Sequence, residues 1–388
     1  MTLDNIAYWA QRKGVDLLGT GDCLQPQWLA EIEELTMETE PGWFQLKPAV
    51  EKAVHARLPA SLRRPVRFVL STEVNCAPAK VDAMHGLHQL LYFPSFAAVR
   101  EFADRAIRWG DLQEGRPTLA ISAQELLQWT AHFDRVFQAP AHVMNPWFSA
   151  LGVIGGDTGL DKVYGNELPR LLAVETGLTS DPVMCRRVPS LDRFGLFSCS
   201  DAHSLENLGR ECTLLSIEPG YDVLMSALRA GTNDRVRGLL KFPLKSTRYF
   251  LNWCSTCKAP FDARTCPQCN RALTTGSRDR LPGLDGARAE PLWPRMTPPS
   301  ESLRPLAWLI AGVEGRKPDS SVARKAEKDI VDQLGQPERI ILTESTAEDL
   351  VRVTKPEIAA AILDQRTGEI SRRGEPGGSR LGQETFAF

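Results

Sequence analysis

The stretch Phe194-Gly-Leu-Phe-Ser-Cys-Ser-Asp-Ala-His-Ser204 is decisive for the fold. It predicts a buried strand, Phe194 to Cys199, that runs out into Asp201 and His203. In α/β proteins, chemistry collects where parallel strands end and loops begin. A carboxylate and an imidazole at such an end can bind one cation together, because zinc, manganese and iron accept His, Asp and Glu as ligands. A polar turn without metal is the alternative reading, since Asp is a common turn residue.

Strand patterns recur on both sides of this stretch, and helical patterns separate most of them. The other strands are expected at residues 15–19, 67–74, 89–93, 118–121, 136–139, 171–174 and 212–217, and the helices at 3–13, 26–35, 96–108 and 122–133. This alternation indicates βα units and a mostly parallel α/β sheet. With the Phe194 strand there are eight strands before residue 220, enough to close into a barrel.

Polar residues recur where these strands finish. The strand-end residues are Asp22, Glu73, His142, Glu175 and Asp201, while His88 comes just before its strand. A barrel gathers strand ends at one face, so residues far apart in sequence can meet there. The recurrence predicts a metal cluster. Of His85 and His88, which flank Gly86-Leu87, one is an expected ligand, and His88 is preferred because it abuts the strand.

Length and composition exclude several classes. A chain of 388 residues is expected to form two or three domains. The net charge of −2 gives no whole-chain signal for nucleic-acid binding. There is no apolar run long enough to span a membrane and no signal-peptide pattern, since Asp4 and Gln11-Arg12-Lys13 are polar. We therefore expect a cytoplasmic protein with reduced cysteines.

Four of the nine cysteines lie in two Cys-x-x-Cys pairs. Cys254, Cys257, Cys266 and Cys269 can supply four thiolates to one structural zinc ion, with a redox pair as the alternative. Residues 241–280 contain eight Lys or Arg and two Asp, so the net charge of this segment is +6 by that count. Basic side chains among aromatic ones suit phosphate contacts and base stacking. Lys245, Arg248 and Tyr249 are therefore expected DNA contacts, unless this segment is a solvated module surface.

The C-terminal third is expected to be helical. Residues 281–300 are rich in Pro and Arg and predict a linker, followed by helices at 302–315 and 319–335. Ser345-x-x-Glu348 and Thr354-x-Pro-Glu357 predict capping boxes that open two more helices. Residues 371–388 lack periodicity and are expected to be disordered.

Several motifs together resemble one known family. They are Gly19-Thr-Gly-Asp22, Thr72-Glu-Val74, Pro140-Ala-His142 through Pro146-Trp-Phe148, Glu175-Thr-Gly-Leu-Thr-Ser-Asp-Pro182, and Ser200-Asp-Ala-His-Ser204 with Leu208-Gly-Arg210. Their order and spacing, with the four cysteines, resemble endonuclease Q over about residues 3–370. The family consists of DNA-repair nucleases with a polymerase-and-histidinol-phosphatase (PHP) domain.

The resemblance implies a distorted PHP-type (β/α) barrel at residues 1–240, a zinc module at 241–285 and a helical DNA-binding domain at 286–370. It implies barrel ligands for Zn²⁺, Mn²⁺ or Mg²⁺ at Asp22, Glu73, His88, His142, Asp201 and His203, all but His88 also being expected catalytic residues. Arg210 is carried over as a DNA contact and Glu175 as a neighbour of the site. The implied reaction is cleavage of double-stranded DNA 5′ to deaminated bases (uracil, hypoxanthine, xanthine) or at abasic sites.

One departure leaves alternatives open. The family begins with a strand that carries a His-x-His pair, and this chain has no His-x-His. The first barrel strand and two ligands are therefore expected to be missing, through a misplaced start codon or in a natural derivative. An open barrel edge could be completed by a partner chain, or a replication or repair factor could bind. A DNA-binding protein without catalysis, and a phosphoesterase for small substrates, are the competing functions.

Overall fold

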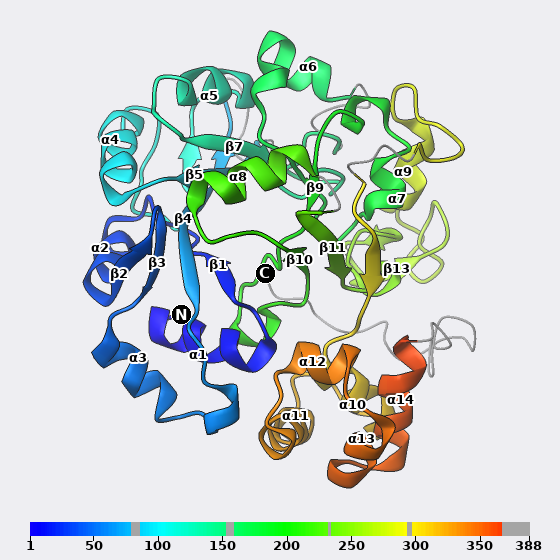
Figure 1. The fold of residues 1–388 in the computed structure, drawn as a ribbon. Helices are drawn as coiled ribbons and strands as arrows, with labels where there is room; N and C mark the ends of the chain where they lie inside the picture. The colour runs from blue at the N-terminus through cyan, green and yellow to red at the C-terminus, as the bar shows by residue number, and fades with distance from the viewer. Residues whose placement is uncertain (79–85, 153–158, 232–233, 293–296, 367–388) are drawn as a thin grey trace.

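The computed structural model describes residues 1–78, 86–152, 159–231, 234–292 and 297–366 (Figure 1). A curled sheet forms half a barrel, with helices on its outer side (Figure 1). The α/β prediction is confirmed. The helices of this part are α1 (Leu3–Lys13), α2 (Pro26–Leu35), α3 (Pro48–His55), α4 (Phe96–Ala106), α5 (Ala123–Thr130), α6 (Leu160–Tyr164), α7 (Pro182–Cys185) and α8 (Tyr221–Ala230).

The long strand β4 (Arg67–Cys76) organises the main sheet. Its first residues pair in parallel with β1 (Leu17–Gly19) and antiparallel with β3 (Trp43–Leu46). Its later residues pair with β5 (Leu87–Phe93) and, in parallel, with β6 (Thr118–Leu119). The outer members are β7 (Phe137–Pro140), beside β5, and β2 (Thr36–Glu40), beside β3. Glu73 therefore lies in the strand that pairs with four other strands of the sheet.

The expected parallel arrangement is wrong for four of the six strand pairings of this sheet. β4 with β5, β5 with β7, β3 with β4 and β2 with β3 are all antiparallel. Strands β2 and β3 form a hairpin that the sequence did not reveal, because Thr36-Met-Glu-Thr-Glu40 is polar and four of its residues lie at the surface or partly exposed. A second correction concerns His88, which lies inside β5 rather than before it.

The remaining strands are short and form separate small sheets. β8 (Val174–Glu175) pairs in parallel with β9 (Leu196–Phe197), so the expected strand at 194–199 shrinks to two residues. β10 (Cys212–Leu215) pairs with β11 (Val236–Lys241), which pairs with β14 (Ser300–Ser302). Within the described ranges no strand pairing joins these sheets to the main one, and β1 pairs with β4 alone. The half-barrel is therefore open, and the expected loss of a first strand stays a prediction.

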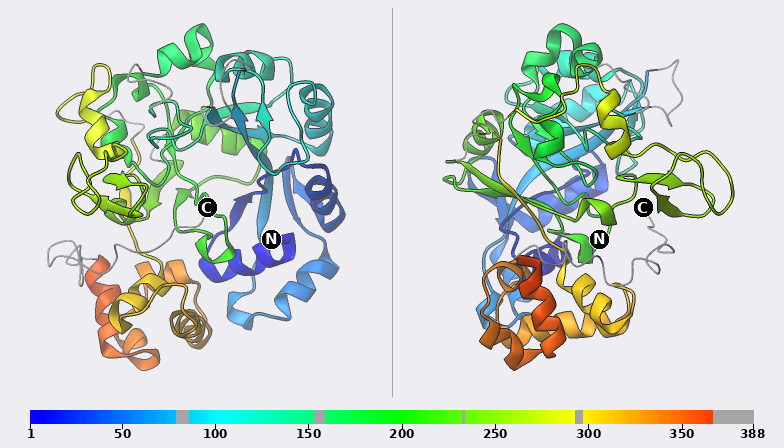
Figure 2. Two further views of the ribbon diagram at one scale, coloured as in Figure 1. Left: turned by 180° about the vertical axis from the view of Figure 1, so that it is seen from behind. Right: turned by 90° about the vertical axis from the view of Figure 1, so that its right-hand side faces the viewer.

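The cysteine-rich segment and the expected linker are more ordered than their composition indicates. β12 (Asn252–Cys254) and β13 (Ala259–Phe261) form a hairpin that protrudes from the body (Figure 2), and α9 (Ser277–Arg280) follows. In the expected linker, Leu281 and Leu284 are buried, and β14 completes a sheet. The described part of residues 281–300 therefore packs against the barrel and does not form a free linker.

The described C-terminal helices form a bundle that contacts α1 (Figure 1). They are α10 (Leu306–Glu314), α11 (Ser321–Leu334), α12 (Glu338–Thr343), α13 (Ala347–Val353) and α14 (Pro356–Arg366). α12 was not predicted. The cap of α13 is Thr346, which accepts from Asp349, because Ser345 is buried and bonds Gln336. The expected disordered tail, 371–388, lies outside the described residues. No helix among the described residues is both long and apolar enough to span a membrane.

Candidate metal centre

Three predicted ligands meet at one end of the central strands. Glu73 of β4, His88 of β5 and His142, two residues after β7, bring their ligand atoms within 4.8 Å of one another. Nδ1 of His88 lies 2.9 Å from Oε1 of Glu73 and 3.1 Å from Nε2 of His142. His88 and His142 are far apart in sequence, and the β5–β7 pairing brings them together. Two imidazoles and one carboxylate are a donor set that divalent zinc, manganese or iron accepts.

The electrostatics of this group fit a bound cation. Burial opposes ionisation of Glu73, but the hydrogen bond and charge of His88, with His142 and Arg116, lower its pKa to about 2. Burial also lowers the pKa of His88, partly offset by Glu73. A carboxylate and a neutral imidazole are the protonation states that bind metals. Nδ1 of His142 is buried and has no hydrogen-bond partner among the described residues, so this ring has an unsatisfied nitrogen beside the group.

His142 is held by a tight arrangement of backbone. Its backbone φ of +32° is unusual for a residue other than glycine. Its N–H donates to Oε2 of Glu175 at 2.6 Å. Gly177 lies so close that a Cβ there would stand 2.4 Å from Cβ of His142. Glu175 also accepts from the N–H groups of Gly177 and Cys199. One buried carboxylate thereby ties together the chain after β7, β8 and β9.

A second buried carboxylate supports the same end of the barrel. Lys241 of β11 forms a buried ion pair with Glu211 and donates to Thr176 Oγ1 and the Gly177 carbonyl. Glu211 also accepts from Ser198 Oγ at 2.7 Å. Burial raises the pKa of Glu175, and the nearby Lys241 charge opposes that rise. Sequence reasoning missed Lys241 and Glu211. The available signal was a lysine inside the apolar run Leu239-Leu-Lys-Phe242, which requires a buried partner.

Asp22 lies beside the three-residue group without joining it. It follows β1 with φ of +48°. Burial and the charge of Glu73 raise the pKa of Asp22, whereas Arg116 and His203 lower it. Since these charges act on one carboxyl, Asp22, Glu73, Arg116 and His203 share one electrostatic environment. Arg116 was also missed by sequence reasoning, because a lone arginine after a glycine carries no specific pattern.

Asp201 and His203 form a separate, more exposed pair. Nδ1 of His203 is 3.7 Å from Oδ1 of Asp201, and both side chains are more than a third exposed. Asp201 has φ of +43°, like Asp22 and His142 at other strand ends. Backbone strain of this kind clusters at functional sites. Arg210 holds the loop by donating to the carbonyls of Ser200 and Asp201, both at 2.7 Å. The structure therefore places Arg210 under the Asp201 turn.

The four cysteines lie together in the protruding hairpin. Their sulfur atoms form a compact group, with Sγ of Cys254 3.5 Å from Cys269 and Cys257 3.7 Å from Cys266. Each Cys-x-x-Cys pair is followed directly by a residue with a left-handed backbone conformation, Lys258 or Asn270. The N–H of Cys257 points to Cys254 Sγ at 3.3 Å and helps to lower the pKa of Cys254 to about 6. This tetrathiol set can hold one zinc ion with no open position.

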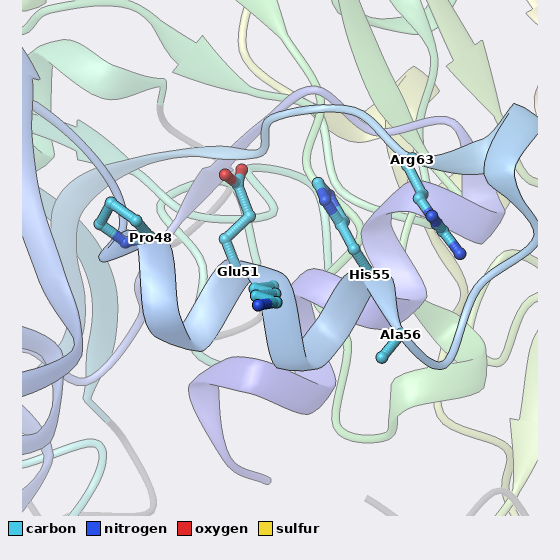
Figure 3. A pocket seen from close by; sticks show the side chains of 6 residues that line it. Pro48, Glu51, His55, Ala56 and Arg63 are labelled. Carbon is cyan, nitrogen blue, oxygen red and sulfur yellow. The ribbon is translucent and has the colours of Figure 1, made fainter.

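The expected DNA contacts lie next to this hairpin. Lys245 is exposed. The Arg248 guanidinium lies over the rings of Tyr249 and Trp253, at 4.6 and 4.9 Å from their centroids. Tyr249 adopts φ of +71°. Trp253 is buried and Arg248 is partly exposed, so the cation–π contacts hold this guanidinium against the module. By contrast, the open pocket in Figure 3 lies along α3, lined by Pro48, Glu51, Lys52, His55, Ala56 and Arg63, and no predicted site residue lines it.

Sequence comparison finds uncharacterised relatives of this chain. No family model matches the chain. The uncharacterised protein YqxK of Bacillus subtilis is 26% identical over 394 residues, covering 98% of this chain and 91% of YqxK. An uncharacterised protein of Methanocaldococcus jannaschii is 26% identical over 297 residues, covering 72% of this chain but only 34% of that protein. The chain therefore spans about a third of this archaeal relative.

Two solved structures match at full-domain scale. The crystal structure of the lesion-specific endonuclease PfuEndoQ from Pyrococcus furiosus has a TM-score of 0.78 and 26% identity, covering 95% of this chain and 86% of that one. The structure of endonuclease Q with a 27-mer duplex substrate carrying an abasic lesion at the active site has a TM-score of 0.80 and 26% identity, covering 95% and 88%. The expected PHP-type fold is confirmed.

Proposed function

The chain is an endonuclease Q-like protein, and we propose that it is a metal-dependent DNA repair endonuclease. Its substrate would be double-stranded DNA, cut at the phosphodiester 5′ to a deaminated base (uracil, hypoxanthine or xanthine) or at an abasic site. The observation that carries the proposal is the Glu73, His88 and His142 group, which lies at the strand ends of a fold shared with a lesion-specific endonuclease.

Divalent ions bound there would supply an activated water and charge stabilisation for the phosphate. The chain's own residues would do the rest. Glu73, His88 and His142 would hold one ion, and Asp22, Asp201 and His203 are the proposed further ligands. Glu175 would fix the His142 backbone, and Arg210 the Asp201 turn. Together these residues would hold the ions and orient the phosphate of the substrate beside them.

DNA contacts are proposed for the module that follows. Exposed Lys245 would pair with a backbone phosphate, and Arg248 on Tyr249 would offer a rigid cation with an aromatic face. The zinc proposed at the four cysteines would keep this surface in shape. A lesion base must leave the stack to be read, and a mispaired or missing base lowers that cost by a few kcal/mol. Deaminated bases and abasic sites share this property.

Nicking of labelled duplexes tests the proposal. Four otherwise identical duplexes would carry one uracil, one hypoxanthine, one abasic analogue or no lesion, with manganese, magnesium or zinc added. A cut on the 5′ side of the lesion that is lost with chelator is the expected result. An equal rate on the undamaged duplex would reject lesion specificity.

The second candidate is a binding protein that has lost catalysis. It is favoured by the absence of any His-x-His in the sequence. The same experiment separates the two functions. Tight, lesion-selective retention of the duplex in a gel, with no cut under any of the three metals, would establish this alternative in place of the nuclease.

The expected cytoplasmic location and a protein partner remain predictions.

A further inference from the structure

Arg116 is the one side chain with a permanent positive charge that an ion pair joins to the three-residue centre among the described residues. Its Nη1 lies 3.2 Å from Oε1 of Glu73. The Arg116 side chain is 44% exposed and that of Glu73 is 18% exposed, so the guanidinium lies at the mouth of the site, with the carboxylate behind it. A group in that place meets any ligand that approaches Glu73 from solvent.

The loop that carries Arg116 is fixed to the same strand as its partner. The N–H of Asn75 in β4 donates to the Pro117 carbonyl at 2.9 Å, and Nδ2 of Asn75 donates to Thr118 Oγ1 at 3.2 Å. Asn75 follows Glu73 by two residues on β4. These two hydrogen bonds fix the backbone next to Arg116 relative to β4, and therefore relative to Glu73.

A glycine allows this loop to reach the second carboxylate. A Cβ at residue 115 would stand 2.9 Å from Oδ2 and 3.2 Å from Cγ of Asp22. Any larger residue would push the loop away from Asp22 or displace that carboxylate. The segment Gly115-Arg116 thus packs across Asp22 and Glu73 together, and places a cation between two acidic groups and solvent.

The ion pair alone does not account for this construction. The Arg116 side chain is nearly half exposed, and ion pairs of such exposed side chains typically contribute little to folding. Among the described residues Arg116 donates only through Nη1, to Glu73, which leaves the Nε and Nη2 edge of the guanidinium for another acceptor. That edge matches the spacing of two oxygens of a phosphate, which arginine binds in a bidentate manner. Arg116 thus places a positive charge beside the carboxylates of Asp22 and Glu73, in addition to the charge of any metal ion that they would hold.

We propose that Arg116 binds the phosphate on the 5′ side of the lesion and positions it against the Glu73, His88 and His142 centre. This inference rests on the proposed function for the identity of the phosphate. The substrate-side ligand is one non-bridging oxygen pair of a DNA phosphodiester. Arg116 is here a substrate-contacting residue and is not itself one of the proposed metal ligands.

A binding cycle tests the contact without catalysis. Equilibrium binding of the full chain to a duplex with an abasic analogue is measured in chelator. The duplex carries either the native phosphodiester or a single uncharged methylphosphonate on the 5′ side of the lesion. We expect the wild type to lose on the order of tenfold in affinity with the uncharged linkage, whereas Arg116→Gln is weakened by a similar factor and is insensitive to that linkage. Arg116→Lys should recover part of the loss.

Two controls keep the result interpretable. Arg105→Gln removes an arginine of similar exposure that pairs with Glu101 on α4, and it should bind like the wild type and respond fully to the linkage. An unchanged thermal unfolding midpoint of Arg116→Gln excludes loss of fold. Additive effects of the variant and the uncharged linkage would overturn the proposal, as would a wild type that ignores the linkage. A coupled cycle in a wild type that fails to nick with any metal would keep the phosphate contact and reject the nuclease.

Discussion

The backbone N–H of His142 donates to Oε2 of Glu175 at 2.6 Å, so a predicted metal ligand is oriented by a buried carboxylate from another strand. Glu175 simultaneously accepts from Gly177 at 2.7 Å. An amide in place of this carboxylate can accept at one atom only and presents an N–H at the other, where it faces a second donor. The relationship makes Glu175 a positioning residue for the whole strand-end cluster.

Glu175→Gln should therefore lower both stability and metal affinity. Leaving one buried N–H unpaired costs about 1 to 3 kcal/mol. We expect a loss of this size in urea unfolding, together with weaker uptake of Zn²⁺ at the barrel in isothermal titration. Glu101→Gln, which alters an exposed pair on α4, is the matched control and should change neither quantity. Wild-type stability and metal affinity in Glu175→Gln would show that His142 does not depend on this bond.

Metal content should divide between two independent sites. Purified wild-type protein loaded with Zn²⁺ should retain one ion in the cysteine module and at least one in the barrel. His142→Ala should lose barrel metal and keep the module ion, because the Glu73 and His88 pair alone offers too few ligands. Cys257→Ser should do the reverse. The measurement is elemental analysis after gel filtration, and equal metal content in His142→Ala and wild type would remove the barrel site.

Asp201→Asn should abolish nicking and spare DNA binding. Asn tolerates the left-handed backbone at this position, where φ is +43°, and Arg210 bonds the carbonyl rather than the side chain. The turn should therefore persist while a ligand charge is lost. Nicking of a uracil duplex and gel retention of the same duplex check this. Nicking at the wild-type rate in the variant would defeat the assignment of Asp201 as a metal ligand.

A buried charge cluster should make the contact between the barrel and the C-terminal helices sensitive to pH. Lys13 of α1 forms ion pairs with Glu327 of α11 and Glu338 of α12, and Arg12 with Asp332 lies beside them. Burial and the Glu338 charge raise the pKa of Glu327 to about 7, against the opposing charge of Lys13. Burial lowers the pKa of Lys13, but the two carboxylates raise it overall.

The raised pKa of Glu327 determines whether stability rises or falls with pH. The folded chain binds this proton more tightly than the unfolded chain, so its contribution is complete below the unfolded value near 4.5 and is lost as pH rises through about 7. Over that window we expect a loss of about 2 to 3 kcal/mol from this group. Glu327→Gln carries no such proton and should gain on the wild type as pH rises from 5 to 7.5. Urea unfolding at several pH values measures the difference, and a constant difference would contradict the assignment.

Much of the candidate site was predictable because its signals are local. Glu73, His142 and Asp201 stand where apolar strand patterns end, and the four cysteines follow the spacing of zinc ligands. The Ser122 and Glu125 capping box was also predicted correctly, since both partners lie within one helical turn. The expected linker failed because Leu281 and Leu284 bury against distant residues, which composition does not encode.

The sequence by itself determined most of the helices, several of the strands, the positions of residue types suited to metal binding and the spacing at which four thiols can gather around one ion. These properties depend on periodicity and on spacing over a few residues. Only the tertiary structure decided that β4 and β5 run antiparallel, that His88 reaches Glu73 and His142, and that Arg116 approaches Glu73. It also decided that Lys241 meets Glu211 and Lys13 meets Glu327 and Glu338. A buried charge is tolerated only when an opposite charge lies within a few ångströms, and the partner's position in the chain is set by how the elements pack rather than by any local pattern.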